Sequence, residues 1–200
     1  MVKAAILAGG RGRRLGGAAK ALLELGGQTI LARQAEILRP LFSEVLLVVG
    51  DEEPYRAAAS SLGLELVRDR EPARGPLAGL QAALDATDAD SLVVVGCDLP
   101  FLDAKLLQLV RDDAPSAEAV VPRVGARPQP LHARYARSIL SHVEARLRRD
   151  ELRLLSLLDD LEVAWLDEPR LRAIDPGLRG LTNLNTPDDL ARARAALAEN

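Results

Sequence analysis

Short apolar runs alternate along this chain with segments of helical spacing, and this alternation limits the fold more than any other feature. Three of the runs are unbroken and rich in β-branched residues, at Ala4–Ala8, Val45–Val49 and Leu92–Val95. Such runs are typical of strands buried on both faces. Segments around 30–41, 55–62 and 77–84 space their apolar residues as helices do. Because each helix must bury its apolar stripe on a sheet, we expect an α/β fold with a doubly wound, mostly parallel sheet in three layers.

Helix-start signals support this arrangement. Gly75-Pro76 predicts the start of the third helix, because proline lacks the N–H that would go unbonded in a first turn. Asp103 is the expected N-cap of a helix that contains Leu106. The clearest start is Thr186-Pro187-Asp188-Asp189, where an N-cap precedes a first-turn proline and two acids that suit the helix dipole. It predicts a final helix to about Ala198.

The second half of the chain is less regular. Strands are expected at 119–122, 129–135, 162–166 and 181–184. Tyr135, Ile139, Val143 and Leu147 repeat at helical spacing and predict a long helix after the second of these strands.

Length and cysteine content favour one domain in a reducing compartment. At 200 residues the chain fits a single domain, 1–200, and roughly 70% of the unfolded surface is buried on folding at this size. The lone Cys97 rules out a cysteine-based zinc site, and we interpret it as a small buried hydrophobe. No apolar run approaches the ~18 residues of a membrane span, and no targeting peptide is evident. The expected location is the cytoplasm, with no membrane contact.

The net charge of −3 hides an uneven distribution. Residues 1–23 hold five basic side chains and no acid, which leaves −8 on the rest of the chain. An isolated cationic segment favours an anionic ligand. Nucleic-acid binders are usually basic overall and offer stacking aromatics, whereas this chain has 2 Phe, 2 Tyr and 1 Trp. We therefore expect no nucleic-acid partner.

A glycine-rich loop follows the first strand, from Gly9 to Lys20. Ligands of open α/β sheets bind beyond the carboxyl ends of strands. Glycines let the backbone approach a phosphate chain, and Arg14 and Lys20 can neutralise a developing pyrophosphate, so the loop suits a nucleoside triphosphate. Leu15 stands where the dinucleotide fingerprint needs glycine, and the loop lacks the adjacent Gly-Lys of a P-loop. The alternative is a flexible surface loop.

Two aspartates also follow predicted strands. Asp98 closes a buried run, so its carboxylate should lie at the same sheet edge as the glycine loop and could hold Mg²⁺. Asp69 ends a shorter run and could accept N–H groups of a base or bind ribose. For both, the alternative is an aspartate that caps a strand end or a turn. Gly79 lies inside the third helix, where glycine costs about 1 kcal/mol relative to alanine, which hints at close packing or a ligand contact.

Two later segments could face a second substrate. Prolines hold 127–131 extended, so Arg127, Gln129 and His132 could contact a polar molecule, although a lone histidine is more often structural. Asn183 and Asn185 precede the last helix. The Asn185 amide could contact a metal or a phosphate at the end of the last predicted strand, and ordinary turn chemistry explains it almost as well.

Together these segments resemble the molybdenum cofactor guanylyltransferases. The matching stretches run in order across nearly the whole chain: Leu7-Ala8-Gly9-Gly10, Arg14-Leu15-Gly16, Lys20, Gly75-Pro76-Leu77-Ala78-Gly79, Cys97-Asp98-Leu99-Pro100-Phe101, Arg127-Pro128-Gln129-Pro130-Leu131 and Asn183-Leu184-Asn185-Thr186-Pro187. The glycine loop alone would indicate only the wider nucleotidyltransferase family. The Leu-Ala-Gly-Gly form and the last two stretches favour the guanylyl branch.

The resemblance implies a nucleotide-diphospho-sugar transferase-like, Rossmann-like fold and a Mg²⁺-dependent reaction. The terminal phosphate of molybdenum-molybdopterin attacks the α-phosphorus of GTP, giving the guanine dinucleotide cofactor and pyrophosphate. Leu7, Ala8, Gly9 and Gly10 would cradle the nucleotide, Asp69 would contact GTP, and Asp98 would hold Mg²⁺. Lys20 would bind the phosphates and act in catalysis with Arg14 and Asp98. A transient handover to a molybdenum insertase or to chaperones of target molybdoenzymes is the expected protein contact.

One departure from the family pattern concerns the second strand. Family members can carry a polar residue there, often Asn, whereas this chain has Val48-Val49-Gly50, so only backbone groups could replace that contact. The nearest alternative is a cytidylyltransferase or sugar-1-phosphate nucleotidylyltransferase of the same fold. From another class, the alternative is a non-catalytic nucleotide-binding regulator. The scarcity of aromatics favours a base held by hydrogen bonds rather than by stacking.

Overall fold

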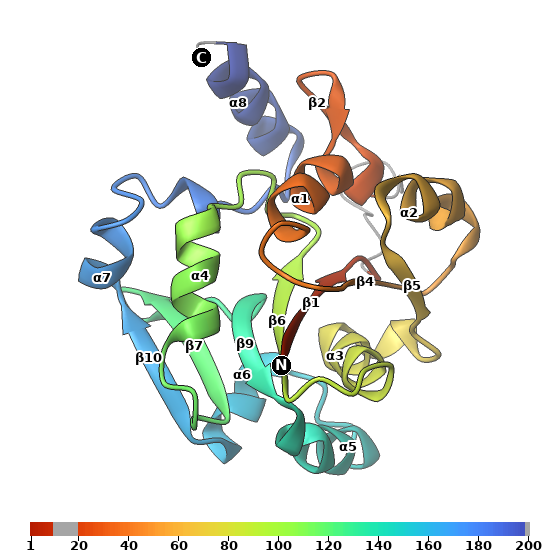
Figure 1. Ribbon diagram of the computed structural model, residues 1–200, viewed down its shortest axis with the longest axis vertical. Coiled ribbons are helices and arrows are strands. Elements are labelled where there is room, and N and C mark those ends of the chain that lie inside the picture. Colours follow the sequence, from red (N-terminus) through yellow and green to blue (C-terminus); the bar gives the residue numbers. More distant parts are fainter. Residues whose placement is uncertain (10–19, 199–200) are drawn as a thin grey trace.

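The computed structural model describes residues 1–9 and 20–198, and an eight-stranded sheet forms its centre (Figure 1). The strands are β1 (Val2–Leu7), β4 (Val45–Val49), β5 (Glu65–Arg68), β6 (Ser91–Gly96), β7 (Ala119–Val124), β8 (Arg127–Pro128), β9 (His132–Ala136) and β10 (Val163–Asp167). Their order is β10-β7-β9-β6-β1-β4-β5, with β8 paired to β7. Only the pairs made by β8 and β9 are antiparallel among these described strands, so the expected mostly parallel sheet is confirmed.

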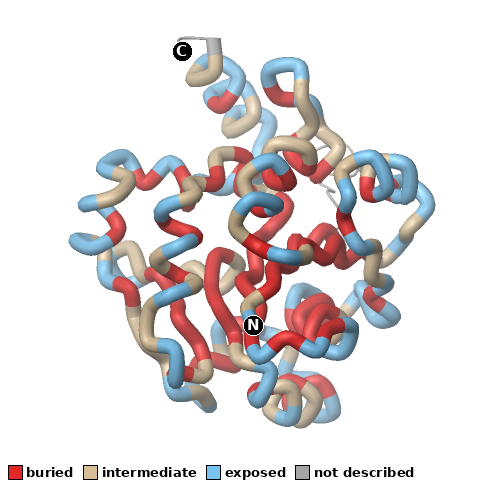
Figure 2. Tube along the Cα trace, in the orientation of Figure 1, coloured by how far each residue is buried: buried red, intermediate tan, exposed pale blue. Residues whose placement is uncertain are grey.

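Helices cover both faces of the sheet and complete the three expected layers. One face carries α1 (Ile30–Leu38), α2 (Arg56–Leu62), α4 (Ala104–Asp112) and α7 (Glu168–Arg172). The other carries α3 (Pro76–Asp85), α5 (Leu140–Arg148) and α6 (Leu154–Leu157). Neighbouring residues of a strand point to opposite faces, so Ile6 packs into the first apolar cluster and Leu7 into the second. The central strands are accordingly buried along their length (Figure 2).

Short elements connect these layers. A hairpin of β2 (Glu24–Leu25) and β3 (Gln28–Thr29) leads into α1. The 3-10 turns are η2 (Lys20–Leu22), η3 (Glu53–Tyr55), η4 (Pro72–Arg74), η5 (Arg137–Ile139), η6 (Leu158–Asp160) and η7 (Arg179–Leu181). The last helix, α8 (Pro187–Ala198), lies with the β2–β3 hairpin at one end of the molecule (Figure 1), where Ala193 and Leu25 share a small apolar cluster.

All three predicted helix starts are confirmed: α3 begins at Pro76 without a side-chain cap, and α4 and α8 begin with side-chain caps. The Asp103 carboxylate accepts hydrogen bonds from the amides of Lys105 and Leu106, at 2.8 and 2.9 Å. At α8 the Thr186 hydroxyl accepts from the Asp189 amide at 3.1 Å, and the Asp189 carboxylate accepts in return from the Thr186 amide at 2.8 Å. These reciprocal bonds form a capping box and fix the segment that enters α8.

Two sequence predictions are wrong. Tyr135 lies in β9, as the predicted strand 129–135 has it, and not in the long helix predicted from the same residue: it pairs with Leu92 and Ala119, and the helix proper begins only at Leu140. Residues 181–184 form no strand. Leu181 ends a 3-10 turn, and the Leu184 amide donates to the Asp98 carbonyl at 2.8 Å instead of joining a ladder.

The strand order creates a switch point between β1 and β6. The chain leaves β1 through α1 for β4 on one side, and it leaves β6 through α4 for β7 on the other. In open α/β sheets, ligands bind in the crevice at such a point, beyond the carboxyl ends of the strands. No helix among the described residues is long and apolar enough to cross a membrane.

Candidate active site

A cavity of about 470 Å³ opens at the carboxyl ends of β1 and β6. That volume lies within the range of small-molecule sites. Its described lining residues are Leu7, Gly9, Lys20, Val48, Asp69, Pro72, Ala73, Gly75, Pro76, Gly79, Gly96, Cys97, Asp98 and Leu131. The set brings Gly9, Lys20, Asp69 and Asp98 together from four separate segments, as the sequence predicts.

Strand register explains why Gly9 and Asp98 meet. Leu7 of β1 pairs in parallel with Gly96 of β6. The Cys97 amide continues the pairing by donating to the Leu7 carbonyl at 3.1 Å. Gly9 and Asp98 each lie two residues beyond this pair, so both leave the sheet at the switch point.

Asp98 occupies space that depends on a glycine. A Cβ atom built on Gly96 would lie 2.6 Å from Asp98 Oδ1, a distance that real Cβ atoms do not adopt. The carboxylate therefore lies back over the end of β6, in the volume that any other residue at position 96 would fill. Gly96 was not identified from the sequence, although an isolated glycine at a strand end is a known sign of a close approach.

Lys20 links Asp98 to the C-terminal part of the chain. Its Nζ lies 3.7 Å from Asp98 Oδ2 and donates to Asn185 Oδ1 at 2.9 Å. The Lys20 side chain is only 14% exposed. The backbone beside it is anchored because Ala21 is fully buried. The result is a cation in the cavity lining, beside the Asp98 carboxylate.

Asp69 forms the other polar wall. It follows β5, is 4% exposed, and its Oδ1 accepts from the Glu71 amide at 2.8 Å. Burial raises the pKa of this carboxyl, and the Glu71 amide bond opposes that rise. A Cβ on Gly9 or Gly79 would lie 3.7 or 3.9 Å from Asp69 Oδ2, so both glycines keep the space around this acceptor open.

The donor set fits a magnesium ion better than a metal held by protein alone. No group of three or more His, Cys, Asp or Glu side chains gathers at one point within residues 1–9 and 20–198. Two carboxylates, Asp69 and Asp98, instead line a cavity large enough for a phosphate chain, and Asp69 already accepts from the Glu71 amide. Mg²⁺ keeps several waters and commonly binds one or two carboxylates together with substrate phosphates. The residues present are compatible with that mode of binding.

The end of β4 contributes an apolar surface. The carbonyl of Val48 accepts from the Ala8 amide and that of Val49 from the Asp69 amide, each at 2.8 Å. Two of the backbone groups that could replace the missing side-chain contact, the carbonyls of Val48 and Val49, are thus engaged within the fold, and Val48 lines the cavity. Gly50 has a packing role, since a Cβ there would lie 2.6 Å from Pro72 Cβ.

The residues assigned to a second substrate are mostly apart from this cavity. Asn185 bonds to Lys20, whereas Arg127 and Asn183 are exposed, and neither they nor Gln129 are among the described lining residues. Leu131 is the part of the 127–131 stretch that reaches the cavity. His132 is 1% exposed, and burial lowers its pKa to about 4, so it is a neutral buried ring.

Two further assignments concern the backbone behind the cavity and the loop before it. Ala8 is buried behind the lining, where its carbonyl accepts from the Tyr55 hydroxyl at 3.5 Å. Gly10 and Arg14 lie outside the described residues.

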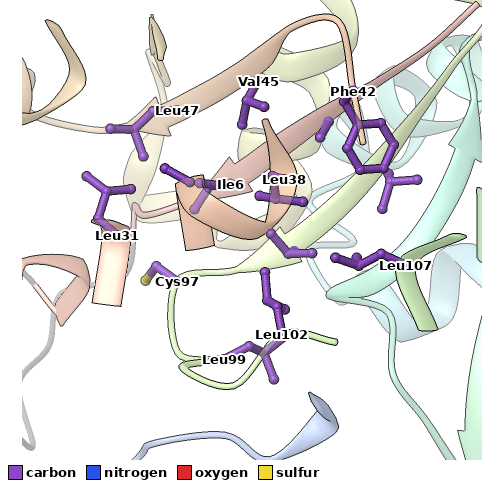
Figure 3. Close-up of a cluster of buried hydrophobic side chains, with 14 of the residues drawn as sticks. Ile6, Leu31, Leu38, Phe42, Val45, Leu47, Cys97, Leu99, Leu102 and Leu107 are labelled. Carbon is purple, nitrogen blue, oxygen red and sulfur yellow. The ribbon is translucent and has the colours of Figure 1, made fainter. Parts of the chain in front are cut away.

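Cys97 behaves as the buried hydrophobe that the sequence predicts. Its thiol packs into the apolar cluster that contains Ile6 and Leu31 (Figure 3). Burial raises the pKa of the thiol to about 12, so the thiolate is not formed near neutral pH. A nucleophilic role is not supported.

Gly79 gives a first prediction, which separates packing from ligand contact. A Cβ there would lie 3.6 Å from the Leu7 methyl carbons, an ordinary contact distance, so the fold has room for alanine. We expect Gly79→Ala to raise the free energy of unfolding by up to about 1 kcal/mol, because alanine favours the helix. The same methyl narrows the cavity beside Asp69, so nucleotide affinity should fall about tenfold. Urea unfolding and calorimetry measure the two effects.

The matched control lies on the same helix. Ala82→Gly, on a half-buried position outside the cavity lining, should lower stability by about 1 kcal/mol and leave nucleotide affinity unchanged. If Gly79→Ala is destabilised and binds nucleotide normally, packing rather than a ligand explains the glycine.

Comparison with known proteins adds a family to this geometry. The model of the MobA-like NTP transferase domain matches residues 4–163. A protein of Pelotomaculum thermopropionicum described as a probable molybdenum cofactor guanylyltransferase is 36% identical over 195 residues, covering 98% of this chain and 92% of that protein.

Solved structures agree on the fold. Molybdopterin-guanine dinucleotide biosynthesis protein A from Archaeoglobus fulgidus superposes with a TM-score of 0.87 at 30% identity and covers 100% of both chains. 2-C-methyl-D-erythritol 4-phosphate cytidylyltransferase from Thermus thermophilus also covers 100% of both chains, with a TM-score of 0.69. At 22% identity that second likeness concerns the fold alone.

Proposed function

We propose an activity for this chain on the basis of its family: it belongs to the MobA-like NTP transferase domain family. It is a nucleotidyltransferase, and we infer that it transfers GMP from GTP to molybdenum-molybdopterin, forming the guanine dinucleotide cofactor and releasing pyrophosphate. One observation carries this proposal: Gly9, Lys20, Asp69 and Asp98 line one cavity at the switch point of the sheet. The relatives named for this activity span almost the whole chain.

The chemistry needs position and charge more than it needs a proton carrier. An oxygen of the pterin's terminal phosphate forms a bond to the α-phosphorus, and the bond between that phosphorus and the oxygen bridging to the β-phosphorus breaks. The attacking phosphate is already anionic, so no general base is required. Gly9 admits the phosphate chain close to the backbone, and Lys20 offers a cation to the leaving pyrophosphate. In this proposal Gly10 and Arg14 extend the same phosphate site.

We assign the metal site to Asp98. Mg²⁺ would supply charge neutralisation on the phosphates, and Asp98 would hold it from the protein side. Lys20, 3.7 Å from that carboxylate and bonded to Asn185, would turn from Asp98 toward the phosphates. Asp69 would accept hydrogen bonds from the nucleoside. The described lining holds no aromatic residue, so the base lies between aliphatic side chains such as Val48 and Pro76.

The two alternative functions, a non-catalytic regulator and a cytidylyltransferase, explain fewer of these observations. A silent nucleotide-binding regulator would have no need of a carboxylate and a lysine poised on one phosphate site. A cytidylyltransferase shares the fold, but the relatives at 30–36% identity carry guanylyltransferase names.

The proposal also covers the setting of the reaction. It treats 1–200 as one nucleotidyltransferase domain acting in the cytoplasm, and it keeps Arg127, Gln129, His132, Asn183 and Asn185 as pterin-side candidates. Handover of the product to a molybdenum insertase or to a chaperone of target enzymes would be tested by pull-down from an extract that makes molybdopterin.

Base preference is the direct test. We expect GTP to bind at least about tenfold more tightly than CTP or ATP in the presence of Mg²⁺, because a wrong base leaves buried hydrogen-bonding groups unpaired. Isothermal titration calorimetry with the three nucleotides measures this. Equal or tighter binding of CTP would remove the guanylyl assignment.

A control variant separates the base from the phosphates. Lys20→Met should weaken GTP, CTP and ATP alike, because all three carry the same triphosphate. A change confined to GTP would place Lys20 at the base instead.

A further inference from the structure

Gln34 is a polar residue in an apolar place. It lies on the face of α1 that also carries Leu31 and Leu38, and it is fully buried. Figure 3 shows Leu31 and Leu38 in the apolar cluster that also holds Cys97 and Leu99. Burying an amide is costly unless it is hydrogen-bonded, so a glutamine here calls for an explanation.

The Gln34 amide bonds to the turn that carries Asp98. Its Nε2 donates to the Gly96 carbonyl at 2.8 Å and to the Leu99 carbonyl at 2.9 Å. These two carbonyls lie on either side of Cys97 and Asp98, so one side chain bridges both ends of the turn. No other side chain of the described residues hydrogen-bonds to the backbone of 96–99.

Backbone bonds fix the turn from other directions. The Cys97 amide donates to Leu7 at 3.1 Å, and the Asp98 carbonyl accepts from the Leu184 amide at 2.8 Å. The Leu99 carbonyl has its bond from Gln34. Gln34 therefore supplies the restraint on the α1 side of the sheet, opposite the face on which Leu7 and Leu131 line the cavity.

These contacts use the amide nitrogen of Gln34 and leave its amide oxygen without a hydrogen bond from the described part of the chain. Its Oε1 is buried and has no hydrogen-bond partner among the described residues. An apolar side chain would remove that unpaired oxygen, but it would also leave the Gly96 and Leu99 carbonyls without this donor, so what glutamine adds here is its two bonds to the turn.

We propose that Gln34 is a positioning residue for the nucleotidyl transfer. It holds the Gly96–Leu99 turn so that the Asp98 carboxylate stays at the cavity mouth beside Lys20. The inference rests on the proposed function, in which Asp98 binds the metal with GTP.

The test replaces Gln34 with methionine, which keeps the length and removes both amide groups. Manganese serves as the probe, since it substitutes for magnesium and is detected by electron paramagnetic resonance. We expect Gln34→Met to weaken Mn²⁺ binding in the presence of GTP by about tenfold, the effect of two lost hydrogen bonds on a preorganised ligand. GTP binding without metal should change by less than about twofold, because the Gln34 side chain does not itself line the cavity.

A second readout needs no metal. Amide hydrogen exchange at Cys97 and Leu99 should be about tenfold faster in Gln34→Met, while exchange in β1 is unchanged. If methionine does not fold, Gln34→Asn serves, because its amide is one methylene shorter and cannot reach both carbonyls; it should shift both readouts in the same direction.

Thr29→Ala is the matched control. Thr29 caps the same helix by accepting from the Ala32 amide at 3.1 Å, and among the described residues its side chain makes no hydrogen bond to the 96–99 turn. It should loosen α1 and lower the melting temperature without changing Mn²⁺ affinity. If Gln34→Met binds Mn²⁺ as the unchanged protein does, or if Thr29→Ala weakens it equally, Gln34 is merely structural and the inference is wrong. If the unchanged protein binds no Mn²⁺ with GTP, the proposed function itself fails.

Discussion

Replacing Asp98 with alanine is expected to lower Mg²⁺-dependent pyrophosphate release from GTP and molybdopterin by about 10²–10³-fold. Asp98 and Asp69 are the carboxylates among the described lining residues, and Asp69 is already bonded to the Glu71 amide. Removing Asp98 therefore removes the ligand that would hold the metal against the phosphates. A coupled pyrophosphate assay across a Mg²⁺ titration measures the loss.

The same variant should separate metal binding from nucleotide binding. Lys20 lies 3.7 Å from Asp98, so losing the carboxylate frees this cation, and GTP binding without metal should be unchanged or tighter. The fold should persist, because a partly exposed ion pair of this kind is worth at most about 1 kcal/mol.

Asp51→Ala provides the control. Asp51 is exposed, lies just beyond β4 at the same sheet edge, and is not among the described lining residues. Its removal should leave turnover intact. Unchanged turnover in Asp98→Ala would eliminate Asp98 as the metal ligand.

The parts of the fold that the sequence predicted are those in which local pattern and tertiary packing agree. Val45–Val49 became β4 because a strand buried on both faces needs an unbroken apolar run. The start of α8 could be predicted because the residues that cap it, Thr186 and Asp189, are close in sequence. Tyr135 was assigned both to a strand and to a helix because it fits both periods, and its pairing with Leu92 and Ala119 shows that it belongs to the strand.

The sequence indicates candidate site residues where a polar side chain follows a strand. It does not indicate contacts between residues that are far apart in the sequence. Asp69 and Asp98 could be proposed from the sequence because each follows a predicted strand, and the carboxyl ends of parallel strands meet at one edge of the sheet. Gln34 was hidden because it sits at a helical core spacing, and its partners are 62 and 65 residues away in sequence. The Lys20–Asn185 contact spans 165 residues, so no local pattern could indicate it.

Gly96→Ala is the second variant with a large expected effect. It displaces the Asp98 carboxylate but leaves that carboxylate in the protein. The new methyl would lie 2.6 Å from Asp98 Oδ1 and 3.4 Å from Leu131 Cβ, so the carboxylate must rotate away. We expect pyrophosphate release to fall about 10- to 100-fold, the usual result of displacing a positioned catalytic group by an ångström or so. Stability should change by about 1 kcal/mol or less, because alanine disfavours a strand less than glycine does and the atom that must move, Asp98 Oδ1, is at the end of a side chain.

A double-mutant cycle shows whether the effect passes through Asp98. Residues that act through one another are not additive, so adding Gly96→Ala to Asp98→Ala should cause no further loss of rate. A rate that falls by the same factor in both backgrounds would mean that the methyl disturbs the cavity by another route, such as through Leu131. The cycle thus tests whether Gly96 affects the reaction only by leaving space for the Asp98 carboxylate. That space is the geometric basis of the proposed metal site.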